Sequence, residues 1–455
     1  MKRALSISII SLVLAVVGAC ATSEDGTPAA SPDLDSDPIT VGDAASNEDA
    51  AFDAGADADT DASNCSSAGW CVTSIPDSDL TFRDIWALPG RAFAVAESPT
   101  LGVKVLEWKD EDAKWSYIDD NTQNESGRGS YAGRIWAPSE DEVYYAVAPR
   151  TIYHGKRSDS PTAAWSWTYS QLENRVPTYA PEPQHPGHYV GRPWYQMCHC
   201  GGVNGLVTGE LGDIPALGVF GTSSDDVYAF YANTIYHLSS DEAGARTWQV
   251  EYVADDRDRD DEQHVFLSAT AVSRDDVWFG GGRGGRPTDN RMCPIAVRRT
   301  PSGYVRVADG VGVTGATPCA ARSDTLSIGG AAGWLADLDV DSTNAVVGLK
   351  AAREVVRITA DGDTYSAAIS APFPMPLSLK PLRSLSAVPD ESTLWIGGTN
   401  LVARSDDAWD GGSYQISTIS LNGGWLETPI NRVRGSSKND RWAVGVRYAL
   451  HKTTP

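Results

Sequence analysis

The densest group of potential ligand side chains in the sequence lies between residues 170 and 215. The segments H-P-G-H (185–188) and W-Y-Q-M-C-H-C-G-G (194–202) bring three histidines together with Cys198 and Cys200. Thiolates and imidazoles at this density can bind zinc or copper. Their spacing matches no closed zinc site, and oxidised cysteines would instead staple the loop. We favour stapling, predict no cofactor, and keep metal binding as the alternative.

Two other segments resemble ligand-binding loops only superficially. The acidic run 255–262 lacks the glycine and the final glutamate of an EF-hand loop, so we interpret it as an exposed charged loop. The glycine-rich run 280–286 lacks the Gly-Lys-Ser/Thr ending of a phosphate-binding loop. No Ser-His-Asp, Cys-His or paired-carboxylate set can be assigned either. The sequence therefore predicts no catalytic residue.

A hydroxyl-and-acid turn recurs between apolar runs, as in V-F-G-T-S-S-D-D-V-Y-A-F (219–230). Serine and aspartate side chains bond to nearby backbone amides and fix tight connections between strands. Three histidines, His154, His237 and His451, also recur at one position of the repeat. Because a catalytic group would not be repeated in this way, we assign the turns and the histidines to packing and local hydrogen bonding.

The N-terminus has the features of an export signal. M-K-R is followed by an apolar run that is too short for a comfortable transmembrane helix. The next residues, Val17-Gly18-Ala19-Cys20, resemble the lipobox of bacterial lipoproteins. That resemblance implies cleavage before Cys20 and its acylation, so that the bilayer becomes a partner of the chain. A plain cleavage after Ala19 is the alternative.

The remaining cysteines are even in number. Without Cys20, six are left in a compartment that permits disulfides. Sequence proximity favours the pairs Cys65–Cys71 and Cys293–Cys319, although six cysteines allow other pairings. The complete set of disulfide candidates is Cys65, Cys71, Cys198, Cys200, Cys293 and Cys319.

Charge argues against nucleic acid as a partner. The 455 residues include 37 Lys and Arg against 60 Asp and Glu, a formal net charge of −23. Such a chain repels phosphate backbones. Residues 21–65 alone contain 12 acidic and no basic side chains. With almost no large apolar residue, this segment cannot offset the entropy of ordering.

These boundaries divide the chain into three parts. We predict a lipoprotein signal peptide at 1–19, a lipidated cysteine with an acidic disordered tether at 20–65, and a folded domain at 66–455. Over the whole chain, 41% of the residues are hydrophobic, and they include 15 Trp and 17 Tyr. This is enough apolar material for a large core in the folded domain.

The folded part is repetitive. Seven segments share an apolar strand, a short polar turn and an aromatic strand, and their alignment puts seven residues in one column: Phe93, Tyr144, Tyr228, Trp278, Val347, Trp395 and Trp442. Successive members of the column are 51, 84, 50, 69, 48 and 47 residues apart. A period near 50 with two insertions is typical of a propeller or an array.

Each unit continues with a third short strand and usually with a fourth that begins with an aromatic residue. Four strands per unit predict an all-β fold with a single seven-bladed β-propeller. The seventh unit stops after its third strand, at Lys452, whereas an unassigned strand precedes the first unit at 70–75. We therefore expect residues 70–75 to complete the last blade and close the ring.

The recurring S-S-x-x-D-V-[WY]-A-V-G pattern resembles repeats of large secreted myxobacterial lipoproteins. The resemblance covers most of residues 80–452 and is clear in five units. It implies a propeller and export, and it implies no defined activity. With the lipobox, it predicts an exported, membrane-anchored lipoprotein in the outer membrane or at the surface of a Gram-negative cell.

The connections between strands suggest where function lies. The long ones fall between strands two and three or between strands four and one, at 119–130, 170–215, 254–264, 281–294, 305–333 and 371–381. In a propeller these connections all emerge at one end of the ring, and such insertions mark a binding surface.

We expect a monomer that acts as a non-catalytic binding or scaffold module for a protein or glycan. A carbohydrate-active hydrolase or lyase using the central pocket is the alternative, and a cluster of arginines and carboxylates with shifted pKa values would favour it.

Overall fold

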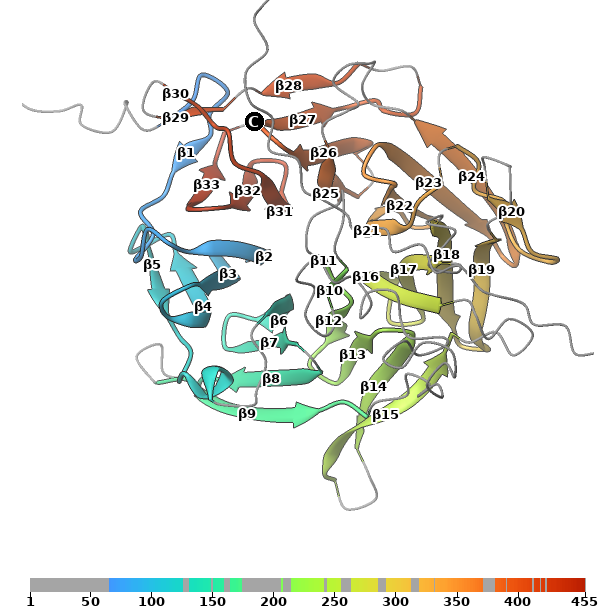
Figure 1. The fold of residues 1–455 in the computed structure, drawn as a ribbon, viewed down its shortest axis with the longest axis horizontal. Coiled ribbons are helices and arrows are strands. Elements are labelled where there is room, and N and C mark those ends of the chain that lie inside the picture. The colour runs from blue at the N-terminus through green and yellow to red at the C-terminus, as the bar shows by residue number, and fades with distance from the viewer. Residues whose placement is uncertain are drawn as a thin grey trace, which may run out of the picture. The chain divides into compact units, whose positions relative to one another are not determined.

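The ring can be followed strand by strand in a computed structural model of the chain (Figure 1). The structure describes residues 65–454 except 126–130, 149, 159–163, 174–205, 208–213, 241–243, 255–262, 285–291, 312–318, 331, 371–380, 390, 411–412, 418 and 422–423. The predicted signal peptide, Cys20, the tether up to residue 64, and Cys198 and Cys200 lie outside the described residues. Within them, no helix is long and apolar enough to cross a membrane.

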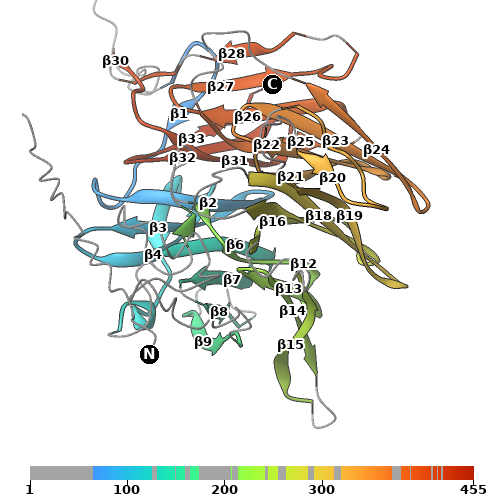
Figure 2. The same ribbon diagram turned by 45° about the vertical axis from the view of Figure 1, so that its right-hand side comes forward.

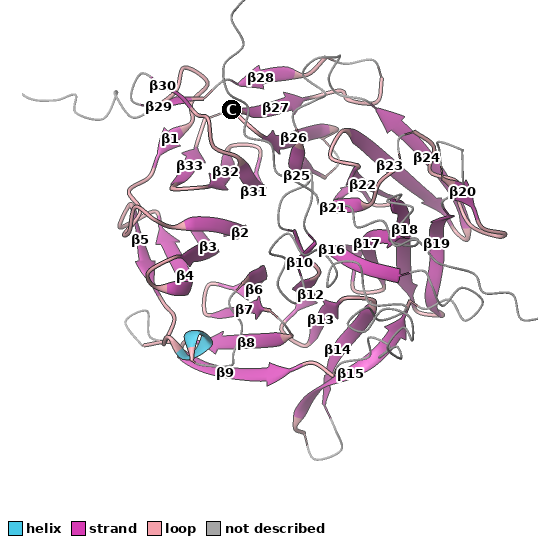
Figure 3. Cartoon of the chain, in the orientation of Figure 1, coloured by secondary structure: helices cyan, strands magenta, loops and turns pink. Residues whose placement is uncertain are grey.

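Nearly every described element is a strand, and the short 3-10 turn η2 (Thr122–Asn124) is the one helical piece coloured in Figure 3. The strands pair in sequence order within each blade. The first three blades are β2 (Thr81–Leu88), β3 (Arg91–Ser98), β4 (Gly102–Lys109) and β5 (Lys114–Tyr117); β6 (Ala132–Ser139), β7 (Glu142–Val147), β8 (Thr151–Lys156) and β9 (Ser166–Gln171); and β12 (Leu217–Ser223), β13 (Asp226–Tyr231), β14 (Thr234–Ser240) and β15 (Arg246–Val253). In Figure 2 the β14–β15 hairpin extends well beyond the neighbouring blades.

The remaining blades repeat this layout. Blade 4 has a fifth, outer strand that the sequence did not predict. These blades are β16 (Gln263–Ser273), β17 (Asp276–Gly284), β18 (Met292–Thr300), β19 (Gly303–Val311) and β20 (Ala320–Ala321); β21 (Leu335–Ser342), β22 (Ala345–Lys350), β23 (Glu354–Asp361) and β24 (Thr364–Ser370); β25 (Leu382–Val388), β26 (Thr393–Gly398), β27 (Leu401–Ser405) and β28 (Gln415–Ser417); and β31 (Ile430–Ser437), β32 (Asp440–Gly445), β33 (Tyr448–Lys452) and β1 (Cys71–Val72).

Seven blades form a closed ring, as predicted. The first strand of each blade lies at the centre, and each contacts the first strand of the next blade, including β31 with β2 (Figure 1). The last blade is completed by the N-terminal strand β1, which pairs antiparallel with β33 through Cys71 opposite His451 and Val72 opposite Leu450. The prediction that residues 70–75 close the ring is confirmed.

The predicted column of aromatic residues corresponds to a single position in the second strand of every blade. Each member is the third residue of the second strand and lies opposite a first-strand residue, as Tyr228 does opposite Phe220 and Trp442 opposite Arg434. These side chains fill the spaces between blades. Trp442, for example, packs edge-to-face on Trp108 and Trp115 of the first blade, with ring centroids 5.3 and 5.2 Å apart. Such aromatic contacts between neighbours stabilise the ring beyond simple burial.

The hydroxyl-and-acid turns have the local role that the sequence predicted. In blade 3 the turn is residues 224–225, between β12 and β13. In equivalent turns the backbone N–H of Asp141, Asp275 or Asn439 donates to the hydroxyl of the serine two residues earlier, at 3.3 Å in each case. This bond fixes the reversal without help from the rest of the fold.

Two short hairpins lie outside the blades and were not predicted. They are β10 (Leu206–Val207) with β11 (Ile214–Pro215), and β29 (Ser420–Leu421) with β30 (Gly424–Trp425). Both interrupt connections that lead from the fourth strand of one blade to the first strand of the next. Tyr414 directly precedes β28, the fourth strand of blade 6, whereas Trp425 lies in β30.

Candidate functional site

The two ends of the ring differ strongly. In an antiparallel blade, the connections from strand four to one and from two to three lie at one end, which we call the long-loop face. The connections from one to two and from three to four lie at the other end, the short-turn face. Six of the seven four-to-one connections are the long ones, at 118–131, 172–216, 254–262, 312–334, 371–381 and 418–429, and the seventh, 73–80, contains eight residues.

The short-turn face has shorter connections, and its longest ones, 157–165 and 406–414 between strands three and four, contain nine residues. Six of the seven connections between strands one and two contain two residues, and the exception is 389–392 in blade 6. The predicted variation between strands two and three is narrower than expected, since only 285–291 in blade 4 is long. The structure therefore confirms which end of the ring is elaborated and assigns most of the elaboration to the connections between blades.

One predicted disulfide ties down part of the long-loop face. Cys293 in β18 bonds to Cys319, next to β20, and both residues are buried. The bond anchors the 312–334 connection to its own blade. Close by, the carboxylate of Asp309 lies 3.0 Å from the guanidinium of Arg283 and 3.0 Å from that of Arg306. The second predicted pair, Cys65–Cys71, is also present, at the ring closure.

The centre of the ring holds a cluster of paired charges. Its members come from the first strands of four blades and are Asp84, Arg134, Asp337, Asp339, Arg432 and Arg434. Arg432 bridges Asp84 at 2.7 Å and Asp337 at 2.6 Å, and Arg434 bridges Asp337 at 3.2 Å and Asp339 at 2.8 Å. Three cations and three anions leave the cluster with no net charge. We call it the central network.

Arg134 extends the central network across the ring. Its guanidinium donates to the carbonyl oxygens of Leu267 and Ala336, which belong to blades 4 and 5, and lies 3.7 Å from Asp84. Blade 3 contributes a glycine, Gly218, at the corresponding position. A Cβ there would come within 2.8 Å of the Arg134 side chain and 2.4 Å of the Phe230 ring. Gly218 therefore makes the space that the stem of Arg134 occupies.

The charges around Asp337 and Arg432 set the pKa values of these two residues. Burial would raise the pKa of Asp337, but the charges of Arg432, Arg434 and Arg134 outweigh burial and lower it. The pKa of Arg432 falls to about 10, because of its burial and of repulsion from Arg134 and Arg434. At neutral pH the aspartate is thus an anion and the arginine a cation.

This arrangement suits structure better than catalysis. Both oxygens of Asp337 are engaged, one by Arg434 and the backbone N–H of Leu338, the other by Arg432 and the backbone N–H of Leu385. A general acid requires a raised pKa and access to substrate. Asp337 has a lowered pKa and is fully buried. The cluster has the composition that the hydrolase alternative requires, but its carboxylates hold blades together.

The recurring histidines lie near the short-turn face in acid–aromatic–cation groups. In blade 3, His237 stacks on Tyr228 with ring centroids 4.5 Å apart and lies 3.1 Å from Asp226 and 3.0 Å from Glu251. Blades 2 and 7 repeat the group with His154 and His451, and blade 4 has Arg298 over Trp278 beside Asp276. The assignment of the histidines to packing and local hydrogen bonding is confirmed.

The other predicted segments divide between described and undescribed residues. Gly280–Gly284 belongs to β17, a strand with a buried backbone, and is not a phosphate loop. The acidic run 255–262 and the His/Cys segment 185–200 lie outside the described residues. Among the described residues, no group of three or more His, Cys, Asp or Glu could hold a metal ion.

The central network was missed by sequence reasoning. The repeat alignment contained a usable signal, because the first-strand positions that carry the network are polar or glycine in every blade. They are Asp84, Arg134, Gly218, Ser268, Asp337, Ser384 and Arg432. Polar residues recurring inside otherwise apolar strands indicate a common buried polar layer.

This chain is similar to known proteins in its fold. No protein-family model matches the chain, and no curated protein matches it. Among solved structures, YCF48 bound to D1 peptide is similar with a TM-score of 0.51 and 11% identity, covering 85% of this chain and 96% of that one. The β-propeller domain of Cps50 (Swd1) from Myceliophteria thermophila gives 0.50 and 9%, covering 85% and 100%. At these identities the similarity shows a shared β-propeller fold.

Proposed function

We propose that the propeller is the non-catalytic binding module of an exported lipoprotein, anchored through acylated Cys20, and that its long-loop face binds a protein or a glycan. The observation that carries the proposal is the difference between the two ends of the ring. The short-turn face has no connection longer than nine residues, whereas five of the six long connections at the other end contain 11 to 45 residues. Rigid scaffolds present binding residues on such loops.

The centre of the ring supports binding over catalysis. The first strands of the blades are held by a central network that is electrically neutral and largely buried, and its Asp337 is an anion at neutral pH. The central network therefore supports the loops rigidly, which favours a binding function over the hydrolase or lyase alternative. The neighbouring propeller structures are those of YCF48, in a complex with a peptide, and Swd1. A protein or peptide ligand for this chain agrees with that fold.

Export and anchoring rest on the sequence. The lipobox resemblance at Val17–Cys20, the acidic segment up to residue 64 and the resemblance to myxobacterial lipoproteins support a chain that stands off the outer membrane or cell surface. A soluble propeller with an incidental cysteine is the competing interpretation. The six long connections would then serve the same binding role in a released protein.

One capture experiment tests both halves of the proposal. The full chain is produced in a Gram-negative host with a labelled fatty acid, in three forms: unchanged, Cys20→Ala, and with residues 174–205 replaced by a short Gly-Ser linker. We expect label and membrane association to be lost only in Cys20→Ala, and recovery of a bound protein or glycan to be reduced only in the shortened chain. Label retained by Cys20→Ala would refute acylation at that site, and undiminished capture by the shortened chain would refute a role for this insertion.

A further inference from the structure

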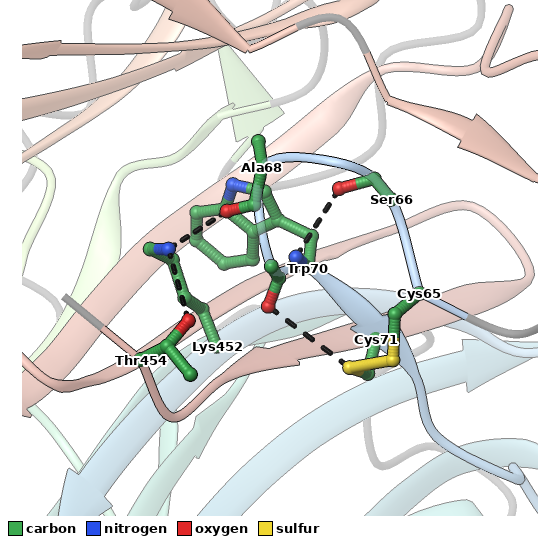
Figure 4. The surroundings of a disulfide bond; sticks show 8 residues. Cys65, Ser66, Ala68, Trp70, Cys71, Lys452 and Thr454 are labelled. Carbon is green, nitrogen blue, oxygen red and sulfur yellow. Dashed lines mark hydrogen bonds between the residues drawn. A yellow bond between two sulfur atoms is a disulfide. The ribbon is translucent and has the colours of Figure 1, made fainter. Parts of the chain in front are cut away.

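The closing strand of the ring is held by a disulfide at its own N-terminal end. Figure 4 shows Cys65 bonded to Cys71, with the turn between them folded back onto blade 7. Within this turn the backbone N–H of Ser66 donates to the carbonyl of Trp70 at 2.7 Å, and the N–H of Trp70 donates to the Ser66 hydroxyl at 3.2 Å. Lys452 Nζ donates to the carbonyl of Ala68 at 2.7 Å.

The turn needs a glycine at its tip. Gly69 has a φ of +81°, a conformation that other residues adopt only with strain, and a Cβ there would lie 2.6 Å from the Thr454 hydroxyl. This geometry directs the indole of Trp70 between blades 6 and 7. Trp70 is fully buried there and meets Trp395 edge-to-face with ring centroids 5.8 Å apart.

The rest of the closure is small. The strand pairing consists of Cys71 with His451 and Val72 with Leu450. Beyond it, Thr73 adds a backbone and a side-chain bond to the carbonyl of Ala449, and Trp115 of blade 1 donates to the Thr73 hydroxyl at 3.0 Å. A two-residue ladder holds little by itself, so the covalent link that keeps the Trp70 turn folded contributes a large share of the closure.

The two described disulfides differ in their access to solvent. Cys65 is exposed and Cys71 is partly exposed, whereas Cys293 is fully buried and Cys319 is 8% exposed. Thiol–disulfide exchange requires that a thiolate reach a sulfur atom, so exposed disulfides react first. The chain thus carries a reactive disulfide at the ring closure and a protected one in blade 4.

We propose that Cys65–Cys71 is a thiol-sensitive latch that controls how firmly the ring is closed at blade 7. A small thiol attacks as its thiolate at one sulfur, forms a mixed disulfide and releases the other cysteine as a thiolate. A second thiol resolves the mixed disulfide, so that two thiols are oxidised to one disulfide and the protein gains two cysteine thiols. The Trp70 turn then opens from its N-terminal end while the other six blades keep their structure. This step does not depend on acylation of Cys20.

The latch is tested on the full chain by timed reduction with dithiothreitol, alkylation and peptide mass spectrometry, with hydrogen exchange measured on the same samples. Cys65 and Cys71 should become alkylated at least about 10-fold faster than Cys293 and Cys319. Exchange of residues 66–75 and 448–452 should rise by about 10- to 50-fold, with the strands of blade 2 unchanged. The peptides of Cys198 and Cys200 are read separately.

Two double variants serve as controls. Cys65→Ser with Cys71→Ser should show the faster exchange at blade 7 without reductant and no further change with it. Cys293→Ser with Cys319→Ser should keep the full response of blade 7 to dithiothreitol. Equal alkylation rates for the two disulfides, no change at 66–75 after selective reduction, or an equal rise in exchange around the whole ring would each overturn the latch. If the first variant does not fold, the alkylation and exchange of the unchanged chain still decide the question.

Discussion

Asp337 is the single residue on which most of the central network depends. It is fully buried, accepts from two arginines, and links blades 5, 6 and 7 through Arg432, Arg434 and the N–H of Leu385. Removing one charge from such a group leaves the opposite charges buried without compensation, which is far more costly than losing a surface pair.

We therefore expect Asp337→Asn to lower the free energy of unfolding by about 3–5 kcal/mol in urea denaturation. Asp225→Asn is the matched control, because Asp225 pairs with Arg274 at the surface, with both side chains more than half exposed. Its cost should be much smaller than that of Asp337→Asn, because solvent screens an exposed pair. Similar losses in the two variants would mean that the central network does not hold the blades together.

His237 makes the stability of the ring depend on pH. Burial by itself lowers the pKa of His237, but its hydrogen bonds to Asp226 and Glu251 outweigh burial and raise the pKa to about 9. A pKa raised above the unfolded value of 6.5 stabilises the fold fully below pH 6.5, and this contribution is lost as the pH rises through about 9.

The unchanged chain should therefore be more stable at pH 6 than at pH 10, relative to His237→Gln, by about 1–2 kcal/mol after allowance for solvent screening. Thermal unfolding of both proteins across this range measures the difference. A constant difference between the two proteins from pH 6 to 10 would contradict the assigned charge of His237.

The outer strand of blade 7 is attached differently from the outer strands of the other six blades. Six blades are continuous meanders, whereas the seventh takes its outer strand from the N-terminus, with Trp70 as the main apolar anchor. Large aromatic side chains in packed interfaces contribute several kcal/mol when they are fully buried. The closing strand should therefore be the most sensitive outer strand of the ring.

Trp70→Ala is expected to cost about 3–5 kcal/mol in the free energy of unfolding and to increase hydrogen exchange first in β33 and β26. Tyr169→Ala, on the outer strand of blade 2, is the comparison, since Tyr169 is 46% exposed. It should cost less than about 1 kcal/mol. Equal effects of the two substitutions would show that the closing strand is no more important than any other outer strand.

The elements that the sequence predicted best are those set by short-range signals. The column from Phe93 to Trp442 and the Ser/Asp turns depend on alternation and local hydrogen bonds, and both match the observed register. The disulfide pairs Cys65–Cys71 and Cys293–Cys319 were favoured by sequence proximity and are present. The central network could not be derived in the same way, because Arg134 meets Leu267 and Ala336 only after the ring has closed.

Considered as a whole, the molecule is a ring whose centre is fixed by paired charges and whose two ends differ. The neutral centre and the short connections of the short-turn face make a rigid support, and the long-loop face varies most from blade to blade. Small hairpins such as β10–β11 and β29–β30 were not predicted, because nothing in the repeat specifies what an insertion between blades will form. The proposed function therefore requires that partners bind at the long-loop face.

Site-specific photo-crosslinking in the producing cells tests this claim most directly. In a first set of variants, a photoreactive residue is placed on the long-loop face at Leu101, Asn400 or Arg447. In a second set it is placed on the short-turn face at Glu140, Asp275 or Lys438, whose side chains are all at least half exposed. We predict crosslinked products from the first set, and their loss when excess unlabelled chain competes. Products from the second set alone would contradict it and would assign the binding surface to the opposite end of the ring.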